Sequence, residues 1–90
     1  MFIHVSNLSY NITEESLSAT FASYGKVTSA FIFSDQSSGQ KIYYALLEMP
    51  NQTEATEAVA KLNGAILDGR FISAQLSPAA EKHRTENLVY

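Results

Sequence analysis

Two kinds of hydrophobic spacing alternate along the 90 residues of this chain, and their order limits the folds it can adopt more than any other feature. Alternation of apolar and polar residues is typical of strands, whereas apolar residues three or four places apart are typical of helices. The strand-like stretches are 2–6, 27–34, 41–49 and 71–76, and helix-like stretches follow Thr13 and the segment 51–53. The order strand, helix, strand, strand, helix, strand predicts two interlocked split βαβ units in an α+β sandwich.

Turn and capping residues support these boundaries. Thr13 is expected to cap the first helix, because acidic residues follow it directly and Gly25 comes after the apolar stripe. Asn51 and Thr53 are both candidates for the cap of the second helix. The polar run 35–39 predicts a turn between the two middle strands, and an extended pair at 66–67 is followed by an Asp-Gly turn.

The apolar stripes of both helices require burial, and we expect both helices to cover the same face of a four-stranded antiparallel sheet. The other face of the sheet is then left open. The residues expected to form the core are Ile3, Val5, Leu17, Phe21, Ala45, Leu47, Val59, Leu62 and Ile72. Tyr10 and Tyr24 are expected to pack against the domain and to make no contact with a ligand.

Composition excludes several classes of function. The chain has no cysteine and only two histidines far apart in sequence, so no metal site or other cofactor is expected. No apolar run approaches the roughly 20 residues of a membrane span, and we expect a cytoplasmic protein. No catalytic constellation is apparent, and no enzyme activity is expected. Residues 1–77 are predicted to form the domain, and residues 78–90 a tail or short helix.

Two segments resemble the ribonucleoprotein motifs of the RNA-recognition-motif family. Residues 3–8 match the shorter motif, with His4 in its aromatic place, and residues 42–49 lie where the longer motif belongs. In the longer motif four residues fit and four depart. Those that fit are Tyr44, Ala45, Leu47 and Glu48, and those that depart are Ile42, Tyr43, Leu46 and Met49. The resemblance extends over about residues 2–77 and implies a ferredoxin-like βαββαβ sandwich with its sheet face as the working surface.

The resemblance implies that bases of single-stranded RNA would contact His4, Tyr44 and Leu46, and strand alternation places the same three side chains outward independently. The same alternation adds four phenylalanines to the open face, unless a bulge reverses the second strand. These are Phe2, Phe31, Phe33 and Phe71. Lys41 is at the start of the third expected strand and Arg70 directly precedes the last, and both are candidates for phosphate contacts.

Two functions remain open at this stage. The first is a single-stranded RNA-binding module with weak affinity and low sequence specificity, because Leu46 replaces an aromatic platform. The second is a protein-interaction module that uses the apolar sheet face for a partner or for a homodimer. The net charge of −3 and the leucine at position 46 favour the second, since strong nucleic-acid binders usually carry a basic face. Asn7-Leu8, Tyr44 and Arg70 favour the first, which is the function we expect, with the second as the alternative.

Overall fold

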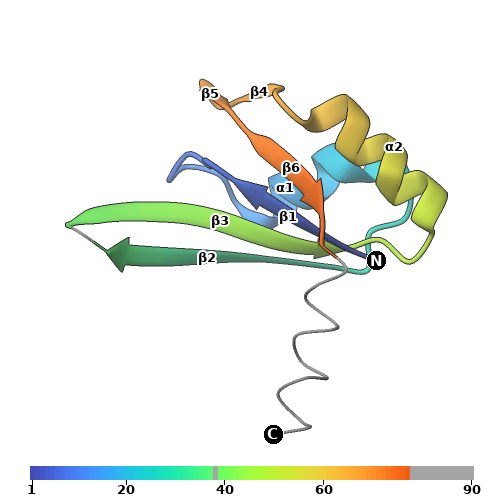
Figure 1. Cartoon of the computed structure of the whole chain (residues 1–90), viewed down its shortest axis with the longest axis horizontal. Coiled ribbons are helices and arrows are strands. Elements are labelled where there is room, and N and C mark those ends of the chain that lie inside the picture. Colours follow the sequence, from blue (N-terminus) through green and yellow to red (C-terminus); the bar gives the residue numbers. More distant parts are fainter. Residues whose placement is uncertain (38, 78–90) are drawn as a thin grey trace, which may run out of the picture.

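Two helices cover one face of a four-stranded antiparallel sheet in the computed structural model, which describes residues 1–37 and 39–77 (Figure 1). The elements are β1 (Phe2–Ser6), α1 (Glu14–Ala22), β2 (Ser29–Ser37), β3 (Gln40–Glu48), α2 (Gln52–Leu62), β4 (Ile66–Leu67), β5 (Arg70–Phe71) and β6 (Ser73–Leu76). The strand order of the sheet is β2-β3-β1-β6, and β4 and β5 form a separate hairpin. The predicted ferredoxin-like βαββαβ fold is therefore confirmed.

Side-chain caps fix the start of both helices. The hydroxyl oxygen of Thr13 accepts a hydrogen bond from the backbone N–H of Ser16 at 3.1 Å, as the sequence predicted. Of the two candidates for the second cap, the structure selects Asn51, whose side-chain oxygen accepts from the N–H of Glu54 at 2.9 Å. Each cap fixes the residue at which its helix begins. This start sets which apolar side chains of the helix face the sheet.

The core lies between the sheet and the helices. Of the predicted core, all residues are buried except Val59, which is half-buried and packs against the cluster from its edge. The core also includes Leu8, Met49, Ala55, Ala58 and Ala74. In the register, Ile3 lies opposite Leu47 and Val5 opposite Ala45, so the paired part of the two central strands presents an apolar face to the helices. The predicted alternation of inward and outward residues holds along β1 and β3.

The hairpin that joins the two middle strands is longer than predicted. Residues 35–37 were expected in a turn, but β2 continues to Ser37, and Asp35 pairs with Ile42 in the register. Polar residues suggested a loop, yet ladder hydrogen bonds come from the backbone and do not require apolar side chains. As a result, β2 and β3 extend together beyond the end of β1, whose pairing with β3 stops at Ala45 (Figure 1).

The last strand is shorter than predicted. It begins at Ser73 instead of Phe71, because Phe71 pairs with Ile66 in the β4–β5 hairpin. Asp68 and Gly69 both have positive φ, of 52° and 82°, which is the backbone of a two-residue type I′ turn. That turn folds Arg70 and Phe71 back onto β4 before the chain joins the sheet, so the predicted Asp-Gly turn is confirmed while the strand boundary is wrong.

Two further expectations from the sequence concern the C-terminal tail and a membrane span. The predicted tail or short helix over residues 78–90 lies outside the described residues. Within residues 1–37 and 39–77, no helix is both long enough and apolar enough to cross a membrane.

Candidate nucleic-acid interface on the open sheet face

One row of outward side chains runs across all four strands of the sheet. In the register, Phe31 lies opposite Leu46, Leu46 opposite His4, and His4 opposite Gln75. Directly opposed residues of antiparallel strands project from the same face. These residues alternate with the buried positions of β1, β3 and β6, so the row lies on the face that the helices leave uncovered.

Four aromatic rings surround the leucine in this row. The His4 and Tyr44 rings have centroids 5.6 Å apart, and the Phe31 and Phe33 rings 6.5 Å. Phe33 joins the two pairs by stacking on Tyr44, with centroids 5.5 Å apart and planes 26° apart. We refer to His4, Phe31, Phe33, Tyr44 and Leu46 as the aromatic face. It spans three strands and forms one continuous surface of π systems around an apolar centre.

The phenylalanines of the aromatic face are well exposed. Phe31 exposes 54% and Phe33 42% of its surface, so the question of a bulge in β2 is settled in favour of outward placement. Their neighbours in the alternation, Ala30 and Ile32, pack against the core. Exposed rings of this kind can stack on bases or pack against an apolar partner.

The charge on this side of the sheet is acidic. By the same alternation, Asp35 and Glu48 lie at the two ends of the outward rows of β2 and β3. None of the described residues that alternate onto this face is a lysine or arginine. The aromatic face therefore offers stacking surfaces but no cation for phosphate groups.

The two outermost predicted phenylalanines lie at the margins of the aromatic face. Phe2 is half-buried and lies opposite Glu48 at the start of β1. Phe71 is 66% exposed but belongs to β5, outside the four-stranded sheet, and its carbonyl oxygen accepts a hydrogen bond from the Asn7 side chain at 2.7 Å. The structure therefore does not place these two rings in contact with the aromatic face.

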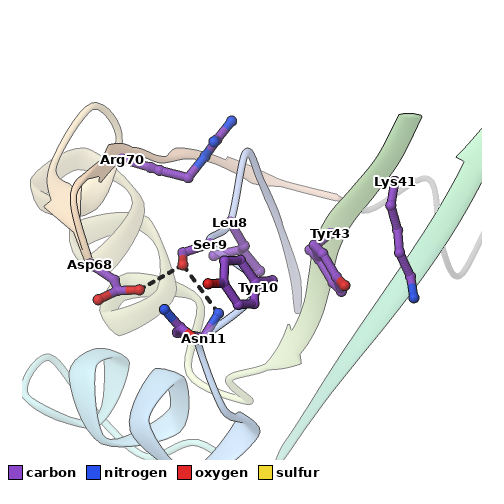
Figure 2. A pocket seen from close by; sticks show the side chains of 8 residues that line it. All are labelled: Leu8, Ser9, Tyr10, Asn11, Lys41, Tyr43, Asp68 and Arg70. Carbon is purple, nitrogen blue, oxygen red and sulfur yellow. Dashed lines mark hydrogen bonds between the residues drawn. The ribbon is translucent and has the colours of Figure 1, made fainter. Parts of the chain in front are cut away.

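The two predicted phosphate contacts lie elsewhere. Lys41 projects from the helix side of β3, with its Nζ 5.7 Å from the ring centroid of Tyr43, a residue that packs against the core. Arg70 donates to Asn7 through Nε and Nη2, at 3.3 and 2.6 Å. Both cations line one cleft at the end of β1, together with Tyr10 and Tyr43 (Figure 2).

Two exposed residues were not among the predicted contacts. Ile42 is 47% exposed and follows the outward alternation of Tyr44 and Leu46 along β3. That same alternation was the signal that could have found it. Tyr10 was expected to pack, yet it is 75% exposed beside the cleft, whereas Tyr24 packs against the core as predicted. Tyr10 lies in a loop, where no strand or helix periodicity indicates whether a side chain points to the core or to solvent.

The described residues hold no group of three or more His, Cys, Asp or Glu side chains that could bind a metal ion. Within that part of the chain, a ligand can meet aromatic rings, apolar side chains and hydrogen-bonding groups, and at the cleft also the charged groups of Lys41 and Arg70.

Comparison with known proteins identifies the family. The family model of the RNA recognition motif matches residues 3–73. The chain belongs to this family. The protein RbpB of Nostoc sp., whose name describes it as RNA-binding, is 43% identical to this RNA recognition motif over 81 residues, which cover 90% of the chain and 79% of RbpB. The glycine-rich RNA-binding protein 1 of Mycosarcoma maydis is 35% identical over 75 residues, covering 83% of the chain but only 43% of that protein.

A solved structure supports the same assignment. The crystal structure of the RNA-binding protein PG1 superposes with a TM-score of 0.74 at 32% identity, covering 83% of this RNA recognition motif and 90% of PG1. RNA recognition motifs bind and do not catalyse, so the expectation that the chain is not an enzyme is confirmed by family membership.

Proposed function

We propose that this RNA recognition motif binds single-stranded RNA on its aromatic face, with weak affinity and little sequence preference. The single observation that carries the proposal is the continuous series of ring contacts from His4 through Tyr44 and Phe33 to Phe31. Unstacked bases are recognised by stacking on such rings. Family membership and the names of the relatives support RNA as the ligand.

Weak affinity follows from the side chains at the three motif positions. Tyr44 offers a full platform, the imidazole of His4 a smaller one, and Leu46 apolar contact without a π system. Each base–aromatic stack contributes about 1–3 kcal/mol, so replacing one platform by leucine removes an interaction of that order. Phe33 and Phe31 compensate in part, because they place rings on the edge strand beside Leu46.

Low specificity follows from the kind of contact. Every base has a π face, so stacking alone discriminates poorly among sequences. The acidic residues at the ends of the outward rows also oppose the phosphate backbone, and the chain has a net charge of −3. Affinity that depends mainly on phosphate neutralisation is therefore not expected on this face.

An NMR titration with a short single-stranded RNA tests the proposal. We expect amide shifts to cluster on the outward residues of β1, β2 and β3, and to need at least fivefold more RNA in Tyr44→Ala. If saturating RNA at low salt moves no amide of these strands, the proposed function is wrong. Single-stranded DNA of the same sequence serves as a second ligand that tests whether the 2′-hydroxyl contributes.

A second candidate function is protein interaction through the same face, with a partner or with a second copy of the chain. The observation that favours it is the exposure of Phe31 and Phe33 on a surface without cations. Exposed apolar surface of this kind often marks an interaction site. Both functions would use the same rings, so RNA and a protein partner would exclude each other.

A further inference from the structure

The cleft at the end of β1, which Lys41 and Arg70 line, lies on the opposite side of β3 from the aromatic face. It has a volume of about 430 Å³ and lies between the loop after β1, the first half of β3 and the β4–β5 turn (Figure 2). Clefts that bind small molecules usually measure ~300–1,000 Å³, so one nucleotide would fit in size. The residues that matter for its chemistry are Tyr10, Asn11, Lys41, Tyr43, Asp68 and Arg70. We refer to it as the loop cleft.

Hydrogen bonds between distant segments hold the walls of the loop cleft in place. The Ser9 hydroxyl donates to Asp68 Oδ2 at 2.6 Å and accepts from the N–H of Asn11 at 3.1 Å. The N–H of Leu8 donates to the carbonyl oxygen of Tyr43 at 3.3 Å. These bonds join the loop to the β4–β5 turn on one side and to β3 on the other, so the cleft exists before any ligand binds.

Asn7 makes a further connection at the edge of this cleft. Its φ of 62° is unusual for a residue with a side chain, although asparagine tolerates it better than most. In this conformation its backbone oxygen and its Oδ1 both accept from Arg70, and its Nδ2 donates to Phe71. The Arg70 guanidinium is thereby fixed at the rim, with donor capacity left for another group.

The loop cleft concentrates the positive charge of the described residues. Their lysines and arginines are Lys26, Lys41, Lys61 and Arg70. Two of these four line the cleft, in a chain whose net charge is −3, and Asp68 is the only acidic residue in the lining. The cations that the aromatic face lacks therefore line this cleft, on either side of Tyr10 and Tyr43 (Figure 2).

The combination of groups indicates which ligand fits. Tyr10 is 75% exposed, and its ring is accessible for stacking. Lys41, which lies near the Tyr43 ring, carries a flexible ammonium group that can reach a phosphate. The Asn11 side chain can both donate and accept, and the Asp68 carboxylate can accept further hydrogen bonds, which suits the polar edge of a base. Aromatic stacking, a cation and polar groups together are how single-stranded RNA is bound.

We propose that the loop cleft is a second nucleotide-binding site, which takes one nucleotide of single-stranded RNA with its base on Tyr10 and its phosphate at Lys41. The proposal rests on the proposed RNA-binding function but concerns a different surface. Because Tyr43 and Tyr44 project from opposite faces of β3, the two sites can be filled and tested separately.

The experiment is an NMR titration of the full chain with a single-stranded tetranucleotide, with uridine monophosphate and with inorganic phosphate. We expect RNA to move the amides of residues 9–11, 41 and 68–70 in addition to those of the aromatic face. Uridine monophosphate should move the cleft amides, and inorganic phosphate should do so at least fivefold more weakly. Tyr44→Ala should weaken the titration of the aromatic-face amides at least fivefold and leave the titration of the cleft amides unchanged.

Matched variants distinguish the loss of the ring or of the charge from a general effect on folding. Tyr10→Ala and Lys41→Gln should each weaken the titration of the cleft amides at least fivefold, as the loss of about 1 kcal/mol or more of stacking implies for the tyrosine. Tyr10→Phe retains the ring and should bind like the wild type. Lys61→Gln removes the same charge from α2, away from the cleft, and should also bind like the wild type.

Each outcome decides between the two proposals. If RNA moves the aromatic-face amides but never the cleft amides, the second site is wrong and the proposed function stands. If only the cleft amides move, the second site stands and the aromatic face is not the RNA surface. If phosphate reproduces the cleft shifts with equal affinity and Tyr10→Ala has no effect, the cleft is a simple anion site and this inference is overturned.

Discussion

The ring of Phe33 on the edge strand β2 stacks on the ring of Tyr44 on the central strand β3, with centroids 5.5 Å apart. The two residues are directly opposite in the register, so the strand pairing itself fixes the contact. In this chain the stacking surface thus extends from Tyr44 on β3 to Phe33 on the edge strand β2, although Leu46 provides no ring at the third motif position. The two rings form a pair whose contributions to binding should be coupled.

The first prediction concerns this pair. Tyr44→Ala should weaken RNA binding by about 1–3 kcal/mol, because it removes the largest base platform. Phe33→Ala should weaken binding in the same direction. The double variant should lose less than the sum of the two, since residues in contact are not energetically independent. Fluorescence anisotropy with a labelled oligonucleotide measures all three.

Ile66→Ala is the matched control for that series, because Ile66 is an exposed apolar residue on the separate β4–β5 hairpin. It should leave RNA affinity unchanged. If the Tyr44 and Ile66 variants lose the same amount of RNA affinity, the aromatic face has no special role in binding.

The second prediction concerns salt. With Lys41 and Arg70 as the cations near a bound strand, about two phosphates would be neutralised, and log Kobs should fall with log salt with a slope of roughly −1.4. Lys41→Gln should reduce the slope by about 0.7. A slope much steeper than about −2.8, which corresponds to four phosphates, would mean that affinity depends on cations that neither site provides.

Alternation predicted the central strands well because one side of each is buried. Ile3 and Leu47 had to face the core, and this fixed the outward direction of His4 and Leu46 without further information. The aromatic face was predictable for the same reason. The ring contacts themselves were not, because they depend on the register between strands, which the periodicity of a single strand does not give.

The predictions were least accurate where the polypeptide turns. The Asp-Gly turn was predicted, but no pattern in the residues indicated that Arg70 and Phe71 would pair with β4 before β6 begins. The loop cleft depends on that pairing and on the bonds between Asn7 and Arg70, which are 63 residues apart. Contacts between loops so distant in sequence leave no periodic signal, so the cleft that Lys41 and Arg70 line could not be predicted.

The third prediction tests the strand register through stability. Leu47 is fully buried, and Leu47→Ala should lower the free energy of unfolding by about 2–4 kcal/mol, as large-to-small core changes do. Ile42 is on the same strand but 47% exposed on the opposite face, so Ile42→Ala should cost no more than about 0.5–1 kcal/mol. Urea denaturation followed by circular dichroism measures both. If the two variants lose the same free energy of unfolding, the assigned faces of β3 are wrong.

The fourth prediction concerns self-association. If a second copy covers the aromatic face, Phe33→Asp should shift the chain toward monomer without lowering its stability, because Phe33 is 42% exposed. Analytical ultracentrifugation across a wide range of protein concentrations measures this. A wild type that stays monomeric at millimolar concentration would contradict the homodimer and leave RNA or another protein as the occupant of the face.

The last prediction is a gain of affinity. Leu46 lies at the centre of the aromatic face, between His4 and Phe31 in one row, and it is the position at which this chain lacks a ring. Leu46→Phe should strengthen RNA binding by up to about 1–3 kcal/mol, because it supplies a third platform at a motif position. Folding should be little affected, since the side chain projects away from the core.

Leu46→Met is the control, because it keeps an apolar side chain of similar size without a π system, and its affinity should equal that of the wild type. Isothermal titration calorimetry with the same oligonucleotide compares the three proteins. If the phenylalanine and methionine variants bind alike, RNA does not stack at this position, and the aromatic face would contact bases only through the rings that surround it.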